Sequence, residues 1–239
     1  MQTVPASYNT ILASDPHWYE TKIVIDGVGT FGESDLFSVS RTWSAFDAVP
    51  SIGNAVSSEI ELKMLLPSTA IPRMGKITLY ERICNSSQQS DWLMQGVFFV
   101  DTRSESNNDD GLKTIKIHGY DAMMKCEQDY PNTNHNWPYL DKSVVAEIAS
   151  TIGVSVDSRT NGFLTAGYMI DLPLGYTMRE TLGHIAAMNC GNFVITSEGK
   201  LLFVPLYGLN SDEWLTGNYL ADENGNALTF GNEGWYILV

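Results

Sequence analysis

The chain has 239 residues, and its 14 lysines and arginines are outnumbered by 28 aspartates and glutamates, which gives a formal net charge of −14. Proteins that hold nucleic acid or an anionic membrane surface gain affinity from clustered basic side chains, so this balance argues against both as partners. With 44% hydrophobic and 18% charged residues, the chain is typical of a globular protein with a buried core and not of a disordered one.

Targeting signals and metal-binding cysteine patterns are not found in the sequence. No apolar run reaches the roughly 20 residues that span a bilayer, and residues 1–18 lack the basic start and apolar core of a signal peptide, so we expect synthesis in a cytoplasm. Cys84, Cys126 and Cys190 are odd in number and far apart in the sequence. We therefore expect reduced thiols, with a disulfide between two of them as the less favoured alternative.

The N-terminal quarter predicts an arm followed by a β-hairpin. Residues 1–18 show little periodicity and indicate an arm that orders only against another surface. Strand character follows at Thr21–Asp26, and then three glycines spaced as G-x-G-x-x-G: Gly27, Gly29 and Gly32. That spacing resembles a dinucleotide fingerprint, but the next residues, 33–46, favour a strand and lack a helical apolar stripe. We interpret the glycines as a hairpin turn.

The next segments predict a mostly antiparallel sheet. Residues 56–64 alternate strictly, with Val56, Ile60, Leu62 and Met64 on one face and charged or polar residues on the other. Further strands are predicted at 76–83, 92–103 and 112–119, and the continuously apolar Val97–Val100 should be covered on both faces. The acidic segment 104–111 is read as a turn, because Ile117 stands where a calcium-binding EF-hand loop needs a bidentate glutamate.

In the second half of the chain the sequence pattern changes from strand-like to helical. Residues 121–126 indicate a short helix and 129–138 an irregular connection, followed by a helix that Asp141 caps and Gly153 ends. A loop is expected at 157–162, and Thr177-x-x-Glu180 predicts a capping box for a second helix that Gly191 ends. A hairpin at 192–196 and 201–205 follows, and the apolar Trp235–Val239 should be a buried strand.

Signatures of catalysis are scarce. The four histidines, His17, His118, His135 and His184, have no metal-binding spacing, and the sequence contains no nucleophile elbow, zincin motif or Walker A motif. The acids nearest apolar sequence are Asp101, Asp121 and Asp129, and all three fit strand ends or helix caps. We assign no catalytic, cofactor-binding or metal-binding residue, expect no cofactor, and expect that the chain is not an enzyme.

Several short motifs, in order, resemble the tail proteins of phages and prophages of Gram-positive bacteria. They cover roughly residues 20–206 and are Pro50–Val56, Ile71–Lys76, Gly96–Arg103, His118–Met123, Glu127–Pro131, Gly175–Gly183 with Ile185–Ala187, and Gly191–Phe193 continuing to Pro205. The proteins concerned are similar to tail-tip or baseplate hubs, which share a fold with the hubs of contractile phages and of type VI secretion spikes.

The resemblance implies a mainly β chain with α+β character: β-barrel hub domains with an inserted helix and β-hairpin module. The expected division is an N-terminal arm (1–18), a β-barrel hub domain (19–125), an α/β module (126–205) and C-terminal strands (206–239) that return to the sheet or to a neighbour. Many such proteins carry a further C-terminal fibre, lysozyme or peptidase region. Since this chain ends at Val239, we do not expect it to hydrolyse cell walls.

The resemblance also implies partners and a location. The chain is expected to form a homotrimeric ring in the virion, at the tail tip or baseplate, after synthesis in the bacterial host cytoplasm. Its expected partners are the tail tube and distal tail proteins, the tape measure protein, and tail fibre or receptor-binding proteins, with DNA only as passing cargo. An acidic lumen wall would repel DNA during ejection, so we expect aspartate and glutamate to be enriched there.

Two other functions remain open at this point. A glycan-binding module of the tail tip could use aromatic side chains as a stacking surface, with Trp137, Tyr139 and Trp214 as candidates. A cryptic cell-wall hydrolase could use paired carboxylates, with Asp101 and Asp129 as candidates.

Overall fold

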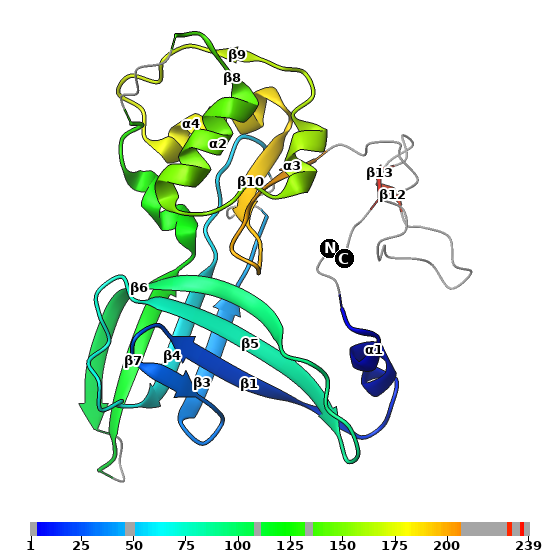
Figure 1. Ribbon diagram of the computed structural model, residues 1–239, viewed down its shortest axis with the longest axis vertical. Coiled ribbons are helices and arrows are strands. Elements are labelled where there is room, and N and C mark those ends of the chain that lie inside the picture. The colour runs from blue at the N-terminus through cyan, green and yellow to red at the C-terminus, as the bar shows by residue number, and fades with distance from the viewer. Residues whose placement is uncertain are drawn as a thin grey trace.

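The computed structural model describes residues 4–45, 51–107, 111–131 and 136–206, together with the backbone of 229–230 and 235–236. A single antiparallel sheet dominates it and curls into a half-barrel (Figure 1). Along the chain its strands are β1 (His17–Ile25), β2 (Gly29–Phe31), β3 (Leu36–Thr42), β4 (Glu59–Leu65), β5 (Lys76–Asn85), β6 (Leu93–Asn107) and β7 (Lys113–Tyr120). Their order in the sheet is β2-β1-β5-β6-β7-β4-β3. The expectation of a mainly β fold is thereby confirmed.

The period-2 pattern explains why the sheet curls around a core. Ile60, Leu62 and Met64 of β4 are fully buried, while the side chains between them face away from the core. Strands β1, β5 and β7 contribute Ile23, Ile77 and Ile117 to the same buried cluster. Burying an aliphatic side chain of this size stabilises a fold by about 1.5–3 kcal/mol, so this alternation fixes which face of each strand points inward.

The glycine-rich segment forms a hairpin turn, as predicted. Gly27 has a φ of 73°, a left-handed conformation that glycine adopts without strain. The Val28 N–H donates to the Ile25 carbonyl, and β1 then pairs antiparallel with β2. No helix follows the glycines, since the next element is β3.

The N-terminal segment contains a helix that the sequence pattern did not reveal. Helix α1 (Ala6–Leu12) packs beside β5 and buries Ile11 completely. Strand β1 begins at His17 and not at Thr21, and its first residues pair with β5 from Asn85 onward. Because the side chains of Trp18 and Tyr19 are both exposed, this part of β1 shows no alternation that would predict a strand.

The second half forms a smaller α/β module at one end of the half-barrel (Figure 1). It contains a 3-10 helix η1 (Ala122–Glu127), strands β8 (Tyr139–Leu140) and β9 (Met169–Ile170), helices α2 (Asp141–Ile152), α3 (Ser158–Phe163) and α4 (Met178–Met188), and the hairpin β10 (Gly191–Ile195) and β11 (Leu201–Pro205). Its own core cluster includes Val144, Ile148, Leu182 and Phe193. Within residues 207–239 the structure describes β12 (Thr229–Phe230) and β13 (Trp235–Tyr236), and most of the predicted C-terminal strand lies outside the described residues.

The helix start at Thr177 confirms the predicted capping box. The Thr177 hydroxyl accepts the Glu180 N–H, and the Glu180 carboxylate accepts the Thr177 N–H in return. Both bonds satisfy donors at the start of α4 that have no partner within the helix. The predicted apolar stripe is also confirmed, because Met178, Leu182, Ile185 and Ala186 are all buried.

Three predicted boundaries are wrong. Helix α2 has Leu140 at its N-cap and starts with Asp141, whereas Asp141 was predicted as the cap. Helix α4 ends at Met188, and Gly191 already belongs to β10, where a Cβ atom would lie 2.3 Å from the Phe203 ring. Strand β6 continues to Asn107, beyond the turn predicted from Ser104.

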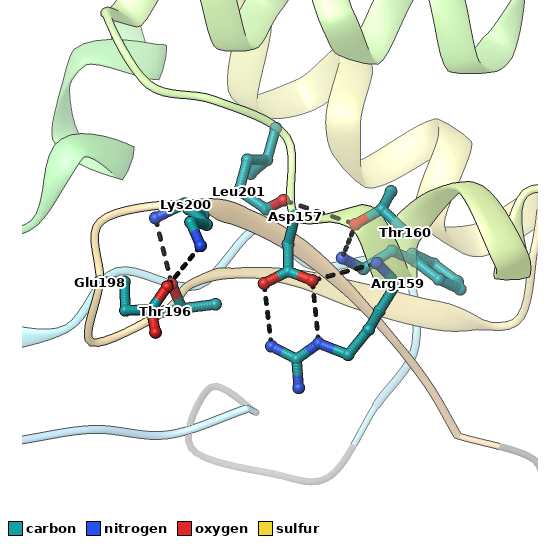
Figure 2. A network of polar contacts seen from close by, with 8 residues as sticks. Asp157, Arg159, Thr160, Thr196, Glu198, Lys200 and Leu201 are labelled. Atoms are coloured by element: carbon teal, nitrogen blue, oxygen red, sulfur yellow. Dashed lines mark hydrogen bonds and ion pairs between the residues drawn. The ribbon is translucent and has the colours of Figure 1, made fainter. Parts of the chain in front are cut away.

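The predicted loop 157–162 is a helix, because Asp157 caps it. The Asp157 carboxylate accepts the Arg159 N–H and also two guanidinium N–H groups, at 2.9 and 3.0 Å (Figure 2). The Thr160 hydroxyl accepts the Phe203 N–H at 3.0 Å and so attaches α3 to β11. Helix α3 was missed because its short sequence has a glycine and no apolar stripe.

Candidate functional site

The half-barrel is open, and two of its strand edges are free within the described residues. Strand β2 covers only Ile23–Ile25, so the outer edge of β1 from His17 to Lys22 pairs with no described strand. At the opposite end of the sheet, β3 pairs with β4 alone. An edge strand presents unpaired N–H and C=O groups, which makes it a template for another chain.

Exposed aromatic side chains lie on or beside both edges. Trp18 and Tyr19 of β1 are 45% and 46% exposed, and Phe37 of β3 and Trp43 just beyond it are 48% and 50% exposed. Large aromatic side chains are enriched in protein interfaces and contribute much of their binding energy. The two edges therefore combine free main-chain groups with the residue types that anchor protein contacts.

A network of charged and aromatic side chains holds the outer half of β1 against the sheet. Two nitrogens of the Arg82 guanidinium, Nε and Nη2, donate to the same Glu20 carboxylate oxygen at 2.8 and 2.6 Å, and these bonds hold the pKa of the Glu20 carboxyl below its usual value. The Lys22 ammonium lies 4.3 Å from the Trp92 ring centroid, and the Arg82 guanidinium stacks on the same ring. The β1 edge is thus part of an ordered surface.

On the other edge, Arg41 of β3 reaches across to β6. It donates to the carbonyl oxygen of Gln95 and lies 3.3 Å from the Gln95 side-chain oxygen. Burial lowers the pKa of the Arg41 guanidinium and raises that of the Glu81 carboxyl, and the attraction between the two opposes both shifts. This contact joins the edge strand β3 to β6.

The half-barrel and the α/β module are joined through two buried polar side chains. The Asp121 carboxylate accepts the Ser58 N–H at 2.7 Å and the Met123 N–H at 2.9 Å, yet burial raises its pKa above the usual value. The Asn192 amide of β10 donates to the Ala45 and Ser51 carbonyls. Asp121 was predicted as a structural cap, and the geometry agrees with that role.

The structure does not assemble the remaining sequence candidates into a catalytic set. His118 lies between two carboxylates, 3.4 Å from Glu59 and 3.9 Å from Asp101, on the outer face of the sheet. Asp129 lies elsewhere, where its main chain forms an isolated antiparallel β-bridge with Thr177. The two acids named for a hydrolase therefore belong to different parts of the fold. Among the described residues, no group of histidine, cysteine, aspartate and glutamate side chains could hold a metal ion.

The aromatic candidates for sugar stacking are mostly part of a core. Trp137 and Tyr139 are half-buried, pack against the core of the α/β module and meet edge to face at 5.9 Å. Trp214 and His135 lie outside the described residues. His184 lies on α4 and contacts the Tyr176 ring edge to face.

The cysteines are all free in the structure. Cys84 and Cys126 are buried, and burial raises the pKa of the Cys126 thiol to about 12, so it stays protonated. Cys190 is exposed. No helix in the described residues is both long enough and apolar enough to cross a membrane.

The structure also has a groove of about 450 Å³ that sequence reasoning did not find. It runs between residues 53–57 and α4, where Arg179, Glu180 and His184 line it. The Arg179 guanidinium donates to the Ala55 and Met123 carbonyls and lies 2.6 Å from Glu127. Two glycines that line it, Gly53 and Gly183, were the available signal, because a Cβ atom on Gly183 would lie 2.8 Å from the Gly53 carbonyl oxygen.

Comparisons with known proteins identify the fold. The chain matches a 43 kDa tail protein from the prophage MuSo2 of Shewanella oneidensis with a TM-score of 0.57 and 16% identity, over 81% of this chain and 57% of that one. It matches a tail protein from Neisseria meningitidis MC58 with a TM-score of 0.51 and 11% identity, over 90% of this chain and 55% of that one. This chain thus spans little more than half the length of either protein. No family model and no curated protein matches the sequence.

Proposed function

We propose that this chain is a structural component of a phage or prophage tail, located at the tail tip or baseplate, where copies of it form a ring. The observation that carries the proposal is the fold shared with two tail proteins, over 81% and 90% of this chain. The arrangement of the candidate side chains supports an assembly role over a catalytic one. The Gram-positive host suggested by the sequence motifs stays a prediction.

The topology of the half-barrel supports a head-to-tail ring. From β1 to β3 the sheet contains six strands, β1-β5-β6-β7-β4-β3, and each is antiparallel to its neighbour. The first and last strands therefore run in opposite directions. When two copies stand side by side in the same orientation, β1 of one and β3 of the next can pair antiparallel. Such a contact uses different surfaces on the two copies, and it closes into a ring when the rotation between copies permits.

We propose three copies in this ring, as expected from the sequence resemblance, together with the other tail partners. The tail tube, distal tail proteins, tape measure protein and fibre or receptor-binding proteins would contact faces of the ring that the free edges leave open. DNA would pass through the ring during ejection, and a net charge of −14 would disfavour its adhesion. The matching structural prediction is an excess of aspartate and glutamate on the inner wall, which a map of the assembled ring would test.

Cysteine cross-linking tests the proposed edge contact. In a Cys190→Ser background, Thr21→Cys on β1 and Ser40→Cys on β3 place one thiol on each edge. A short bis-maleimide should then link protomers into dimers and closed trimers on a denaturing gel. The matched control pairs Thr21→Cys with Lys116→Cys, on the outer face of central strand β7. Equal cross-linking in both pairs, or none in the first, would contradict the edge contact.

A further inference from the structure

The free edge of β1 offers main-chain groups from alternate residues only. On the β2 side the Ile25 carbonyl accepts the Val28 N–H, and on the β5 side the Asp26 N–H donates to the Lys76 carbonyl. Successive residues of a strand direct their polar groups to opposite sides, and β1 pairs with β5 without a register shift. The residues that direct theirs to the free edge are therefore those at odd positions: His17, Tyr19 and Thr21.

The free edge of β3 can be worked out in the same way. The Leu65 N–H donates to the Asp35 carbonyl, on the β3 side, whereas the Leu66 N–H donates to the Lys113 carbonyl, on the β7 side. Odd residues of β4 therefore face β3, and the register places even residues of β3 opposite them. The odd residues of β3 and the position just beyond it direct their polar groups to the free edge: Val39, Arg41 and Trp43.

Both sets of residues also place their side chains on the same face of the sheet. Ile23, of the same parity as Tyr19, belongs to the buried core of the half-barrel, and the His17 and Tyr19 rings meet edge to face. Arg41 lies opposite the buried Ile60 across the β3–β4 pair, and residues directly opposite each other share a face. Joining the two edges would therefore continue one sheet, with the core face of one copy next to the core face of the other.

We propose that β1 of one copy pairs with β3 of a second copy in a single register, in which Tyr19 lies opposite Arg41. This inference rests on the proposed function and specifies the pairing within that same contact. All three free positions on each edge are used, because the flanking residues then match as well: His17 with Trp43 and Thr21 with Val39.

Other registers use fewer of the free positions. A shift of one residue would place main-chain groups that face the edge opposite groups that face away from it, and would put core-face side chains on the outer face. A shift of two residues in one direction places Val39 opposite Ile23, whose edge β2 already occupies. A shift of two in the other direction places Thr21 opposite Phe37, where the register of β3 is irregular.

The side chains that meet in this register are complementary. Tyr19 and Trp43 are 46% and 50% exposed in one copy and would be covered by the contact. A tyrosine ring beside the Arg41 guanidinium forms a cation–π contact, and Trp43 would pack against the His17 ring. On the outer face the charged residues of β1 lie opposite serines of β3, so no like charges oppose each other.

Disulfide formation between two different chains tests the register. In a Cys190→Ser background, one chain carries Lys22→Cys and a co-expressed chain carries Ser38→Cys, with an affinity tag on one so that the mixed dimer has its own mass. In the proposed register these residues form a close pair, with Cα atoms about 4.5–5.5 Å apart, which is within the range of a disulfide. The matched control is Ser40→Cys, an exposed serine of the same strand that would lie diagonal to Lys22, about 7–8 Å away. We expect the mixed disulfide to form several-fold more with Ser38→Cys than with Ser40→Cys.

A double-mutant cycle gives a second reading that needs no cysteine. Tyr19→Leu and Arg41→Leu should each weaken association, and the double variant should weaken it about two- to fivefold less than the product of the two effects, as for one cation–π contact at an exposed site. Arg41→Leu also removes the bonds to Gln95, and the cycle cancels that loss. The control combines Tyr19→Leu with Phe37→Leu, whose effects should multiply.

Other results would overturn the proposal. Equal disulfide yields at the two serines, or no coupling in the cycle, would mean that the edges meet without this register. A disulfide that forms only inside a chain carrying both Lys22→Cys and Ser38→Cys would mean that β1 and β3 close on each other within one copy. If the bis-maleimide links Thr21→Cys to Ser40→Cys while the mixed disulfide does not form, only the register fails. If that reagent links the edges no better than its control, the proposed function fails with it.

Discussion

Replacing Asn192 should separate the α/β module from the connection between β3 and β4. This amide is fully buried on β10 and makes three hydrogen bonds with that connection. Its nitrogen donates to the carbonyls of Ala45 at 2.9 Å and Ser51 at 2.8 Å, and its oxygen accepts the Asn54 N–H at 2.9 Å. Asn192→Leu keeps the approximate size of the side chain and removes all three bonds, although the Ser51 carbonyl still accepts the Asn54 side-chain amide.

The expected cost can be worked out from these bonds. A group that loses its partner away from water costs about 1–3 kcal/mol, and here the Ala45 carbonyl and the Asn54 N–H lose theirs, so Asn192→Leu should lower the free energy of unfolding by about 2–4 kcal/mol. The matched control is Asn189→Leu. Asn189 is also buried, but its side chain makes a single described hydrogen bond, to the Ile185 carbonyl of its own helix. We expect this control to cost about 1 kcal/mol.

Urea unfolding followed by circular dichroism measures both values, and an unchanged slope shows that the unfolding transition is comparable. Amide exchange at Asn54 should also become faster in Asn192→Leu and stay unchanged in Asn189→Leu. If the two variants lost equal stability, Asn192 would not hold the connection, and the reasoning from its three bonds would be refuted.

Two further predictions concern the α/β module. Gly191→Ala should destabilise the fold by about 3 kcal/mol, because the new Cβ would lie 2.3 Å from the Phe203 ring. The matched control is Gly162→Ala in α3, whose Cβ would meet nothing within 4 Å and which should stabilise the fold by about 0.5–1 kcal/mol. Thermal unfolding of both variants measures these changes, and equal effects would contradict the prediction. For Asp157, the Arg159 guanidinium lowers the carboxyl pKa below 3.8, so its stabilisation is complete above pH 3.8 and is lost as the pH falls through the folded-state pKa. Asp157→Asn should therefore cost about 1–3 kcal/mol at pH 7, and the difference from the native protein should shrink below pH 4; a difference that stays constant with pH would be inconsistent with this account.

Elements with strong local signals could be predicted from the sequence. The alternation of Ile60, Leu62 and Met64 identified β4 because one face of that strand meets a core. The Thr177 and Glu180 pair identified the start of α4 because both residues satisfy main-chain donors there. In these places the local pattern and the packing of the whole fold require the same structure.

The missed elements depend on contacts between residues far apart in the sequence. Helix α1 is held by the burial of Ile11 beside β5, and α3 is fixed to β11 through Thr160. The groove along Ala55 and Ser57 arises only when residues 53–57 pair with β10, more than 130 residues later in the chain. No local pattern contains that pairing, so the groove could not be predicted.

The solution mass of the protein tests the central proposal, a ring built through the edges of β1 and β3. Light scattering after gel filtration, over a range of concentrations and at moderate salt to screen the charge of −14, measures it directly. The account predicts about 80 kDa for the native protein, three times the chain mass of 26.5 kDa, and 26.5 kDa for a variant that combines Trp18→Ser with Phe37→Ser. A native protein that stays at 26.5 kDa at every concentration, or a trimer that the two substitutions leave intact, would contradict it.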